Sequence, residues 1–214
     1  MLIITAYATA PVDNGGMKRQ RDTKSGRVVL PRSVLDLPPA VRQWTGLITA
    51  VLCATVFWRL GWSPATPAFL ALPVFSVVLG VVDLRTRLLP NALLLPFGVT
   101  ALVLFTLASL VSGEWDRLAG AIVGSAAMFA LYLVLALVSP GGLGMGDVKL
   151  AAVLGLYGGY AGMTAWTVTV LGGFVLGALI GVFLLLAQKA SRRSVFPFGP
   201  PMLMACFAGV VGFA

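Results

Sequence analysis

The chain has 214 residues, of which 59% are hydrophobic and 10% charged, and its net charge is +8. A soluble domain carries about 25% charged residues, so this composition excludes a water-soluble globule and indicates membrane-spanning helices. Because the sequence contains no histidine, catalysis by Ser-His-Asp or Cys-His groups and HExxH zinc chemistry are excluded. Cys53 and Cys206 lie far apart in apolar runs, so we expect neither a CxxC site nor a disulfide framework.

Residues 1–43 are basic, contain several prolines and show no sustained apolar period, which predicts a disordered cytoplasmic tail. From residue 44 onwards, apolar runs alternate with short loops. This pattern predicts an all-α integral membrane protein, a polytopic bundle of six to seven transmembrane helices. We place an extra N-terminal helix in residues 44–65 and the main core in residues 66–214. The predicted spans lie near residues 45–60, 66–82, 92–112, 118–138, 148–160, 163–187 and 201–214.

Basic residues are distributed unevenly over the predicted loops. If the N-terminal tail is cytoplasmic, thirteen of the fifteen Lys and Arg residues fall on the cytoplasmic side, and Arg59 and Arg117 fall outside. An excess of basic residues on one side is the usual determinant of membrane orientation. It also explains the positive net charge without a nucleic-acid partner, so we expect none.

Glycines recur at a spacing of four residues in two of the predicted spans. Gly173, Gly177 and Gly181 share one helix face, and so do Gly120 and Gly124. Small residues at this spacing let helix backbones approach closely in lipid. We expect packing within the chain, with a homodimer through the first three glycines as the alternative.

Four acidic residues follow the predicted tail: Asp83, Glu114, Asp116 and Asp147. Glu114 and Asp116 fall in a predicted external loop, where solvation explains them. Asp83 and Asp147 fall where apolar spans meet cytoplasmic loops, and acidic groups at membrane depth indicate function. The structural alternatives are a helix cap for Asp147 and an ion pair with Arg85 or Arg87 for Asp83.

Two neighbouring carboxylates tend to share one proton, because both do not ionise easily at close range. The ionised member then activates water as a general base, while the protonated member polarises a peptide carbonyl. This aspartic-protease chemistry needs no metal and no cofactor, and we expect neither. The alternative from a different class is a non-enzymatic transporter or proton-relay protein that uses the same aspartates.

Three segments of the chain resemble motifs of the type IV prepilin peptidases. Residues 82–91, VDLRTRLLPN, are similar to the family's D-x-R-x-x-x-(I/L)-P-N segment, and residues 141–150, GGLGMGDVKL, are similar to its G-x-G-D motif. Residues 196–201, FPFGPP, resemble the P-F-G-P segment that opens the family's last span. The resemblance covers roughly residues 66–214.

The resemblance implies a GxGD-type aspartic endopeptidase in the bacterial cytoplasmic membrane, with its N-terminus and active site on the cytoplasmic side. Such enzymes remove the short basic leader from type IV prepilins, Flp-type pilins or pseudopilins. Asp83 and Asp147 match the catalytic aspartates, and Gly144 and Gly146 give the backbone freedom for close approach to a substrate. The other residues expected to bind substrate or shape the site are Arg85, Pro90, Asn91, Lys149, Pro197, Phe198, Gly199 and Pro200. Lys149 either pairs with a carboxylate or extends to the membrane surface.

The sequence departs from the larger family members in one respect. Those members carry an N-terminal cytoplasmic domain with paired CxxC motifs, which is associated with methylation of the new pilin N-terminus. Neither cysteine of this chain has a CxxC neighbour. We therefore expect peptidase activity without methyltransferase activity.

Overall fold

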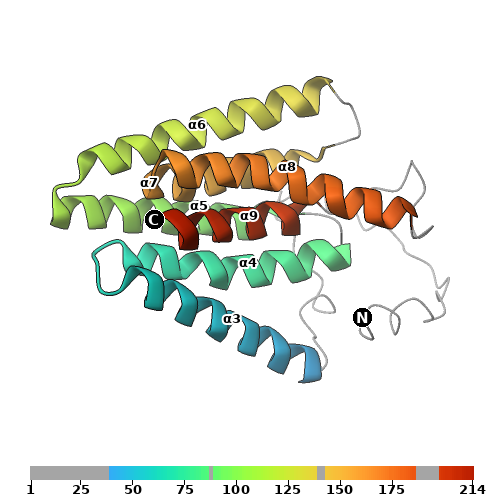
Figure 1. The fold of residues 1–214 in the computed structure, drawn as a ribbon, viewed down its shortest axis with the longest axis horizontal. Helices are drawn as coiled ribbons and strands as arrows, with labels where there is room; N and C mark the ends of the chain where they lie inside the picture. The colour runs from blue at the N-terminus through green and yellow to red at the C-terminus, as the bar shows by residue number, and fades with distance from the viewer. Residues whose placement is uncertain (1–38, 87–88, 139–142, 187–197) are drawn as a thin grey trace, which may run out of the picture.

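The computed structural model describes residues 39–86, 89–138, 143–186 and 198–214, and these residues form a bundle of α-helices (Figure 1). In chain order the helices are α3 (Pro39–Leu60), α4 (Thr66–Thr86), α5 (Asn91–Ser112), α6 (Trp115–Val138), α7 (Met145–Ala161), α8 (Met163–Leu186) and α9 (Gly199–Phe213). Each predicted span falls on one of these helices, so the all-α fold class is confirmed. Helix α3 begins at Pro39, ahead of the predicted span, and residues 1–38 of the predicted tail lie outside the described residues.

Among the described residues, four helices are long and apolar enough to cross a membrane. They are α4, α5, α6 and the Met163–Phe183 part of α8, and each has 21 to 24 residues. Helices α7 and α9 have 17 and 15 residues, or about 26 and 22 Å, against a hydrocarbon core of about 30 Å. Large apolar side chains cover much of the outer surface, including Leu110, Val123 and Phe183. An apolar exterior of this extent suits a lipid environment rather than water.

Helix α7 lies in the centre of the bundle and packs against α6 through glycines on both helices. A Cβ atom at Gly155 would lie 2.7 Å from the Cα atom of Ser125, and one at Gly159 would lie 2.9 Å from the carbonyl carbon of Gly120. The indole nitrogen of Trp166, in α8, donates a hydrogen bond of 3.1 Å to the carbonyl oxygen of Gly124. The prediction that Gly120 and Gly124 serve packing within the chain is therefore confirmed.

An aromatic cluster joins α4, α5 and α7. The rings of Phe105 and Tyr160 stack with centroids 4.2 Å apart, and Phe69 meets Phe105 edge-on at 5.2 Å. The hydroxyl groups of Tyr160 and Ser109 are hydrogen-bonded at 3.3 Å. Since aromatic pairs fix orientation as well as burying area, this cluster sets the position of α4 relative to α7.

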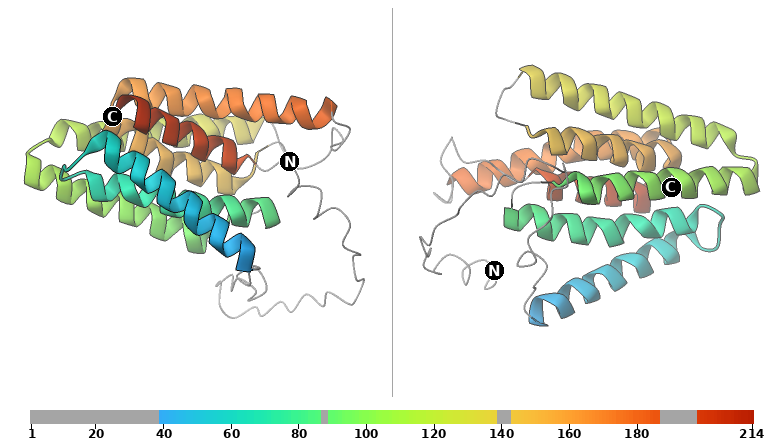
Figure 2. Two further views of the ribbon diagram at one scale, coloured as in Figure 1. Left: turned by 60° about the horizontal axis from the view of Figure 1, so that its bottom comes forward. Right: turned by 180° about the vertical axis from the view of Figure 1, so that it is seen from behind.

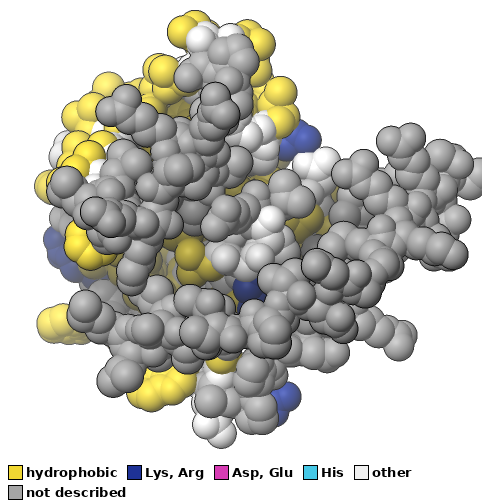
Figure 3. Space-filling view, turned by 90° about the vertical axis from the view of Figure 1, so that its right-hand side faces the viewer, with side chains coloured by type: hydrophobic (Ala, Val, Ile, Leu, Met, Phe, Trp, Pro, Cys, Tyr) yellow, Lys and Arg dark blue, Asp and Glu magenta, His cyan; other side chains and the backbone are white. Residues whose placement is uncertain are grey.

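The helices alternate in direction, so that one end of the bundle collects a defined set of termini. Helices α4, α6 and α8 end there, and α3, α5, α7 and α9 begin there (Figures 1 and 2). Figure 3 looks onto this end and shows Lys and Arg side chains among hydrophobic ones on the described surface. The described candidate site residues lie on or next to these termini.

Candidate active site

Asp83 and Asp147 reach the same end of the bundle from positions 64 residues apart in the sequence. Asp83 lies in the last turn of α4 and is only 3% exposed, and Asp147 lies in the first turn of α7 and is half-buried. The two carboxylates are near enough to interact electrostatically. The fold therefore brings together the two acidic groups that the sequence assigned to one site.

The carboxylate of Asp83 is held by the start of α9. The backbone N–H of Gly199, the first residue of that helix, donates a hydrogen bond of 3.2 Å to Asp83 Oδ2. A negative charge is disfavoured at the C-terminal end of its own helix, and the N-terminus of α9 supplies the compensating N–H and dipole. Helix α9 thus stabilises a buried carboxylate that α4 alone does not.

Asp147 is held in a similar way, but by its own helix. The backbone N–H of Gly144, at the N-cap of α7, donates a hydrogen bond of 3.1 Å to Asp147 Oδ2. Asp147 therefore does cap a helix, as the structural alternative proposed. The cap also orients its carboxylate toward the end of the bundle where Asp83 lies, so the structural and functional interpretations are compatible.

Leu89 connects the three motifs at this end. A Cβ atom at Gly146 would lie 2.9 Å from the Cβ atom of Leu89, and one at Gly199 would lie 3.6 Å from its Cδ1 atom. Glycine at both positions lets the segment that precedes α5 pass directly over the starts of α7 and α9. Pro90 then caps α5 with an extended backbone, at φ −71° and ψ 138°.

Lys149 contacts an amide rather than a carboxylate. Its Nζ atom donates a hydrogen bond of 2.9 Å to Oδ1 of Asn91, and both residues are exposed. The described ion pair of the chain, Arg117 with Glu114, lies at the opposite end of the bundle. The prediction that Lys149 pairs with a carboxylate is not supported by this contact, which instead links α5 to α7.

The third motif enters the bundle through Phe198. Its ring lies against Gly177 of α8, and its centroid is 6.4 Å from that of Tyr132. A Cβ atom at Gly173 would lie 3.2 Å from the Tyr132 hydroxyl, whereas one at Gly181 would meet nothing within 4 Å. Two of the three glycines suggested for a homodimer therefore face neighbours in the same chain. Pro200 is the second residue of α9, and Pro197 lies outside the described residues.

Tyr132 was not singled out from the sequence. Its side chain is fully buried, it stacks on Phe174 at 5.1 Å, and it interacts electrostatically with Asp147. Its hydroxyl has no hydrogen-bond partner among the described residues. One tyrosine within a long apolar span carries no sequence signal that distinguishes it from an ordinary core residue.

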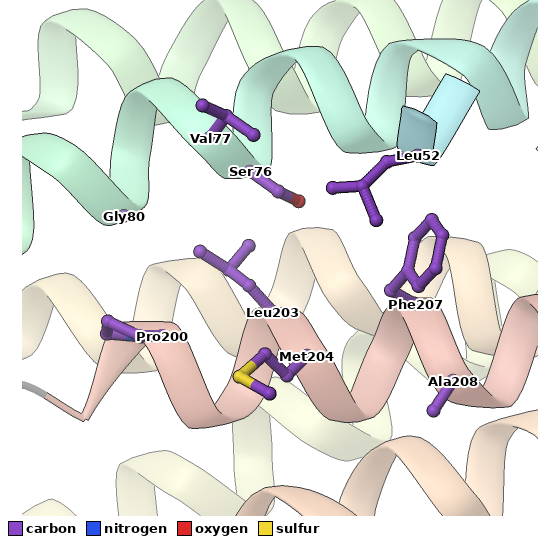
Figure 4. A pocket seen from close by; sticks show the side chains of 9 residues that line it. All are labelled: Leu52, Ser76, Val77, Gly80, Pro200, Leu203, Met204, Phe207 and Ala208. Atoms are coloured by element: carbon purple, nitrogen blue, oxygen red, sulfur yellow. The ribbon is translucent and has the colours of Figure 1, made fainter. Parts of the chain in front are cut away.

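An apolar cleft of about 410 Å³ lies between α4 and α9 and reaches Leu52 of α3. Gly80, one turn before Asp83, and Pro200, next to Gly199, line its end near the site. The hydroxyl of Ser76 points into it (Figure 4) and has no hydrogen-bond partner in the described part of the chain. Within that same part, no group of three or more His, Cys, Asp or Glu side chains could hold a metal ion.

A family model described as the Type IV leader peptidase family matches residues 70–186, which is more than half of the chain. The chain belongs to this family. The match includes both aspartates and the motifs around them, so the resemblance inferred from those motifs is confirmed. No solved structure matches the chain.

Curated relatives named prepilin leader peptidase/N-methyltransferase are similar over most of the chain. The relative from Stutzerimonas stutzeri is 34% identical over 160 residues, which are 74% of this chain and 54% of that protein. The relative from Pseudomonas putida is 34% identical over 167 residues, 76% of this chain and 55% of that protein. The relative from Neisseria gonorrhoeae is 30% identical over 160 residues, 74% of this chain and 53% of that protein.

The chain spans about half the length of these curated relatives. The relatives are bacterial, and the family member described here has four helices suited to crossing a membrane. Together these findings support a protein of the bacterial inner membrane.

Proposed function

We propose that this leader-peptidase family member is a membrane-embedded aspartic endopeptidase that removes the basic leader from type IV prepilin-like precursors. The observation that carries the proposal is that Asp83 and Asp147 lie at one end of the bundle within electrostatic reach of each other. Each carboxylate accepts a hydrogen bond from a glycine N–H, that of Gly199 or Gly144. Type IV prepilins, Flp-type pilins and type II pseudopilins are the substrate classes. No metal or cofactor takes part.

The reaction follows from a carboxylate pair that carries one proton. The ionised aspartate removes a proton from water, and the oxygen of that water attacks the scissile carbonyl carbon. The protonated aspartate donates a hydrogen bond to the carbonyl oxygen as negative charge develops on it. When the tetrahedral intermediate collapses, the C–N bond breaks and the leaving amine takes a proton from the pair.

The proposed site faces the cytoplasm, where a basic leader remains after membrane insertion. The uneven distribution of Lys and Arg supports this orientation, because the sequence assigns thirteen of fifteen to predicted cytoplasmic segments. The described ones among them, Arg42, Arg85 and Lys149, lie near the helix ends that carry the site. The apolar cleft between α4 and α9, lined near the site by Gly80 and Pro200, offers a place for an apolar stretch of the precursor. Gly144 leaves the space beside the Asp147 carboxylate free of a side chain, since a Cβ atom there would lie 3.3 Å from Oδ2.

The direct test is co-expression of the chain with one precursor of each of the three classes, followed by intact mass measurement of the pilin. We expect a loss equal to the mass of the leader for at least one class. A further gain equal to one methyl group would contradict the expectation of peptidase activity alone. Unchanged mass for all three classes, in membranes that contain the folded chain, would overturn the proposal.

Gly199→Ala is expected to reduce cleavage about a hundredfold. A Cβ atom at this position would lie 2.7 Å from Oδ2 of Asp83, so the carboxylate must move and lose the N–H of residue 199. Displacement of a reacting group by about 1 Å commonly costs that much in rate. The matched control is Gly212→Ala, on the same helix, where the new Cβ atom meets nothing within 4 Å. Equal cleavage rates for the two variants would show that the contact does not position Asp83.

A further inference from the structure

A groove lies on the outside of the bundle between α5 and α7, separate from the apolar cleft between α4 and α9. It has a volume of about 400 Å³. Its lining consists of Asn91, Leu94, Leu95, Gly98 and Val99 of α5 together with Lys149 and Val153 of α7. The side chains of Leu95 and Val99 are 71% and 53% exposed, so the groove opens toward the surroundings of the bundle. Since α5 is one of the four apolar spans, those surroundings are lipid.

Gly98 forms this groove by its lack of a side chain. A Cβ atom at Gly98 would lie 3.2 Å from Cγ2 of Val153, so α5 approaches α7 closely at this level. Between Asn91 and Val99 the helix rises about 12 Å, which is most of one leaflet of a hydrocarbon core about 30 Å thick. The groove therefore has the length and the apolar walls that suit an acyl chain.

The two ends of the groove differ in chemistry. Lys149 and Asn91 lie at the end that carries the candidate active site, and the other five lining residues are apolar. The ammonium group has three N–H donors, and the hydrogen bond to Asn91 uses one of them. The seven lining residues include no carboxylate. One end of the apolar groove thus carries a positive charge, and no acidic group is among the lining residues.

We propose that this groove binds an anionic phospholipid, with its phosphate at Lys149 and Asn91 and an acyl chain between α5 and α7. A cation at the membrane surface attracts anionic headgroups, and the apolar walls accept the chain below it. The net charge of +8 favours anionic over zwitterionic lipid around the whole chain.

This lipid would stabilise the candidate active site from the outer surface of the bundle. Lys149 follows Asp147 by two residues, and Asn91 follows Leu89, the residue that packs on Gly146, by two. A headgroup that contacts Lys149 and Asn91 together holds the start of α5 against the start of α7. Binding itself does not depend on the proposed peptidase activity, so the two proposals can fail separately.

The test is native mass spectrometry of the purified full chain, titrated with phosphatidylglycerol or phosphatidylcholine. We expect tighter binding of phosphatidylglycerol, and Lys149→Gln should weaken that binding about fivefold while leaving phosphatidylcholine binding unchanged. Leu95→Trp, which fills the groove from an exposed position, should weaken the binding of both lipids. Arg59→Gln is the control, because Arg59 is an exposed cation in the last turn of α3, at the end of the bundle opposite Lys149.

Three results would overturn the lipid site. The first is equal affinity of the wild-type chain for the two lipids, and the second is an equal loss of phosphatidylglycerol binding in Lys149→Gln and Arg59→Gln. The third would show that the groove binds the precursor instead. In that case Leu95→Trp would weaken precursor binding and leave the binding of both lipids unchanged.

Discussion

Replacement of Asp83 or Asp147 by Asn is expected to abolish leader cleavage. Asn has nearly the same size as Asp, and its side-chain oxygen can still accept the N–H of Gly199 or Gly144, so the helices keep their positions. An amide accepts no proton from water and donates none to the leaving amine. Loss of one member of such a pair should reduce the rate at least about a thousandfold. The measurement is the rate of leader loss from a co-expressed precursor, followed by intact mass.

The control variant is Asp116→Asn. Asp116 lies in the first turn of α6, is exposed, and belongs to the end of the bundle opposite the site. This variant removes one carboxylate without changing the proposed catalytic pair, so cleavage should continue at the wild-type rate. Thermal unfolding in detergent should give similar midpoints for all three variants. Cleavage that persists in Asp83→Asn or Asp147→Asn would remove that residue from the mechanism.

Gly155→Ala is expected to cause one of the largest losses of stability of a single methyl addition among the described glycines. The new Cβ atom would lie 2.5 Å from the carbonyl oxygen of Gly124 and 2.7 Å from the Cα atom of Ser125. Both are backbone atoms, which cannot rotate away as a side chain can, so α6 and α7 must separate. Overpacking of this kind costs about 3 kcal/mol at its upper range. The measurement is the free energy of unfolding in mixed micelles.

Gly181→Ala provides the comparison for that prediction. Gly181 is also a glycine inside a long apolar helix, and a Cβ atom there would meet nothing within 4 Å. Because alanine has a higher helix propensity than glycine, this variant should be unchanged or up to about 1 kcal/mol more stable. If the two variants unfold at the same denaturant concentration, the glycine contacts between α6 and α7 do not limit stability.

The helices were largely predictable from the sequence because each apolar run is bounded by loop residues. Gly113 illustrates this, since it ends α5 in a left-handed conformation at φ 77° that glycine adopts without strain. The pattern of apolar residues predicts whether a segment forms a helix, but it predicts the ends of that helix poorly. The start of α3 at Pro39 was missed for that reason, since proline is well tolerated in the first helical turn.

The sequence motifs indicated the candidate site residues but not the contacts between them. The motifs indicated that Asp83 and Asp147 belong together, whereas the hydrogen bond from Gly199 to Asp83 joins residues 116 positions apart. A contact of that kind depends on how α9 packs against α4. The same applies to the link between Lys149 and Asn91, since nothing local to either residue specifies its partner. Tyr132 was missed because its burial and its proximity to Asp147 arise only from packing.

The most direct test of the account is to compare cleavage by the wild-type chain with cleavage by Asp83→Asn, Asp147→Asn and the double variant. Residues that act as one catalytic unit are strongly non-additive, so loss of either should cost as much as loss of both. The account predicts a leader-sized mass loss for the wild type and only the precursor mass for all three folded variants. If each single variant cleaves faster than the double variant, and the two single losses in rate multiply to the loss in the double variant, the aspartates contribute independently. That result would contradict a shared catalytic pair.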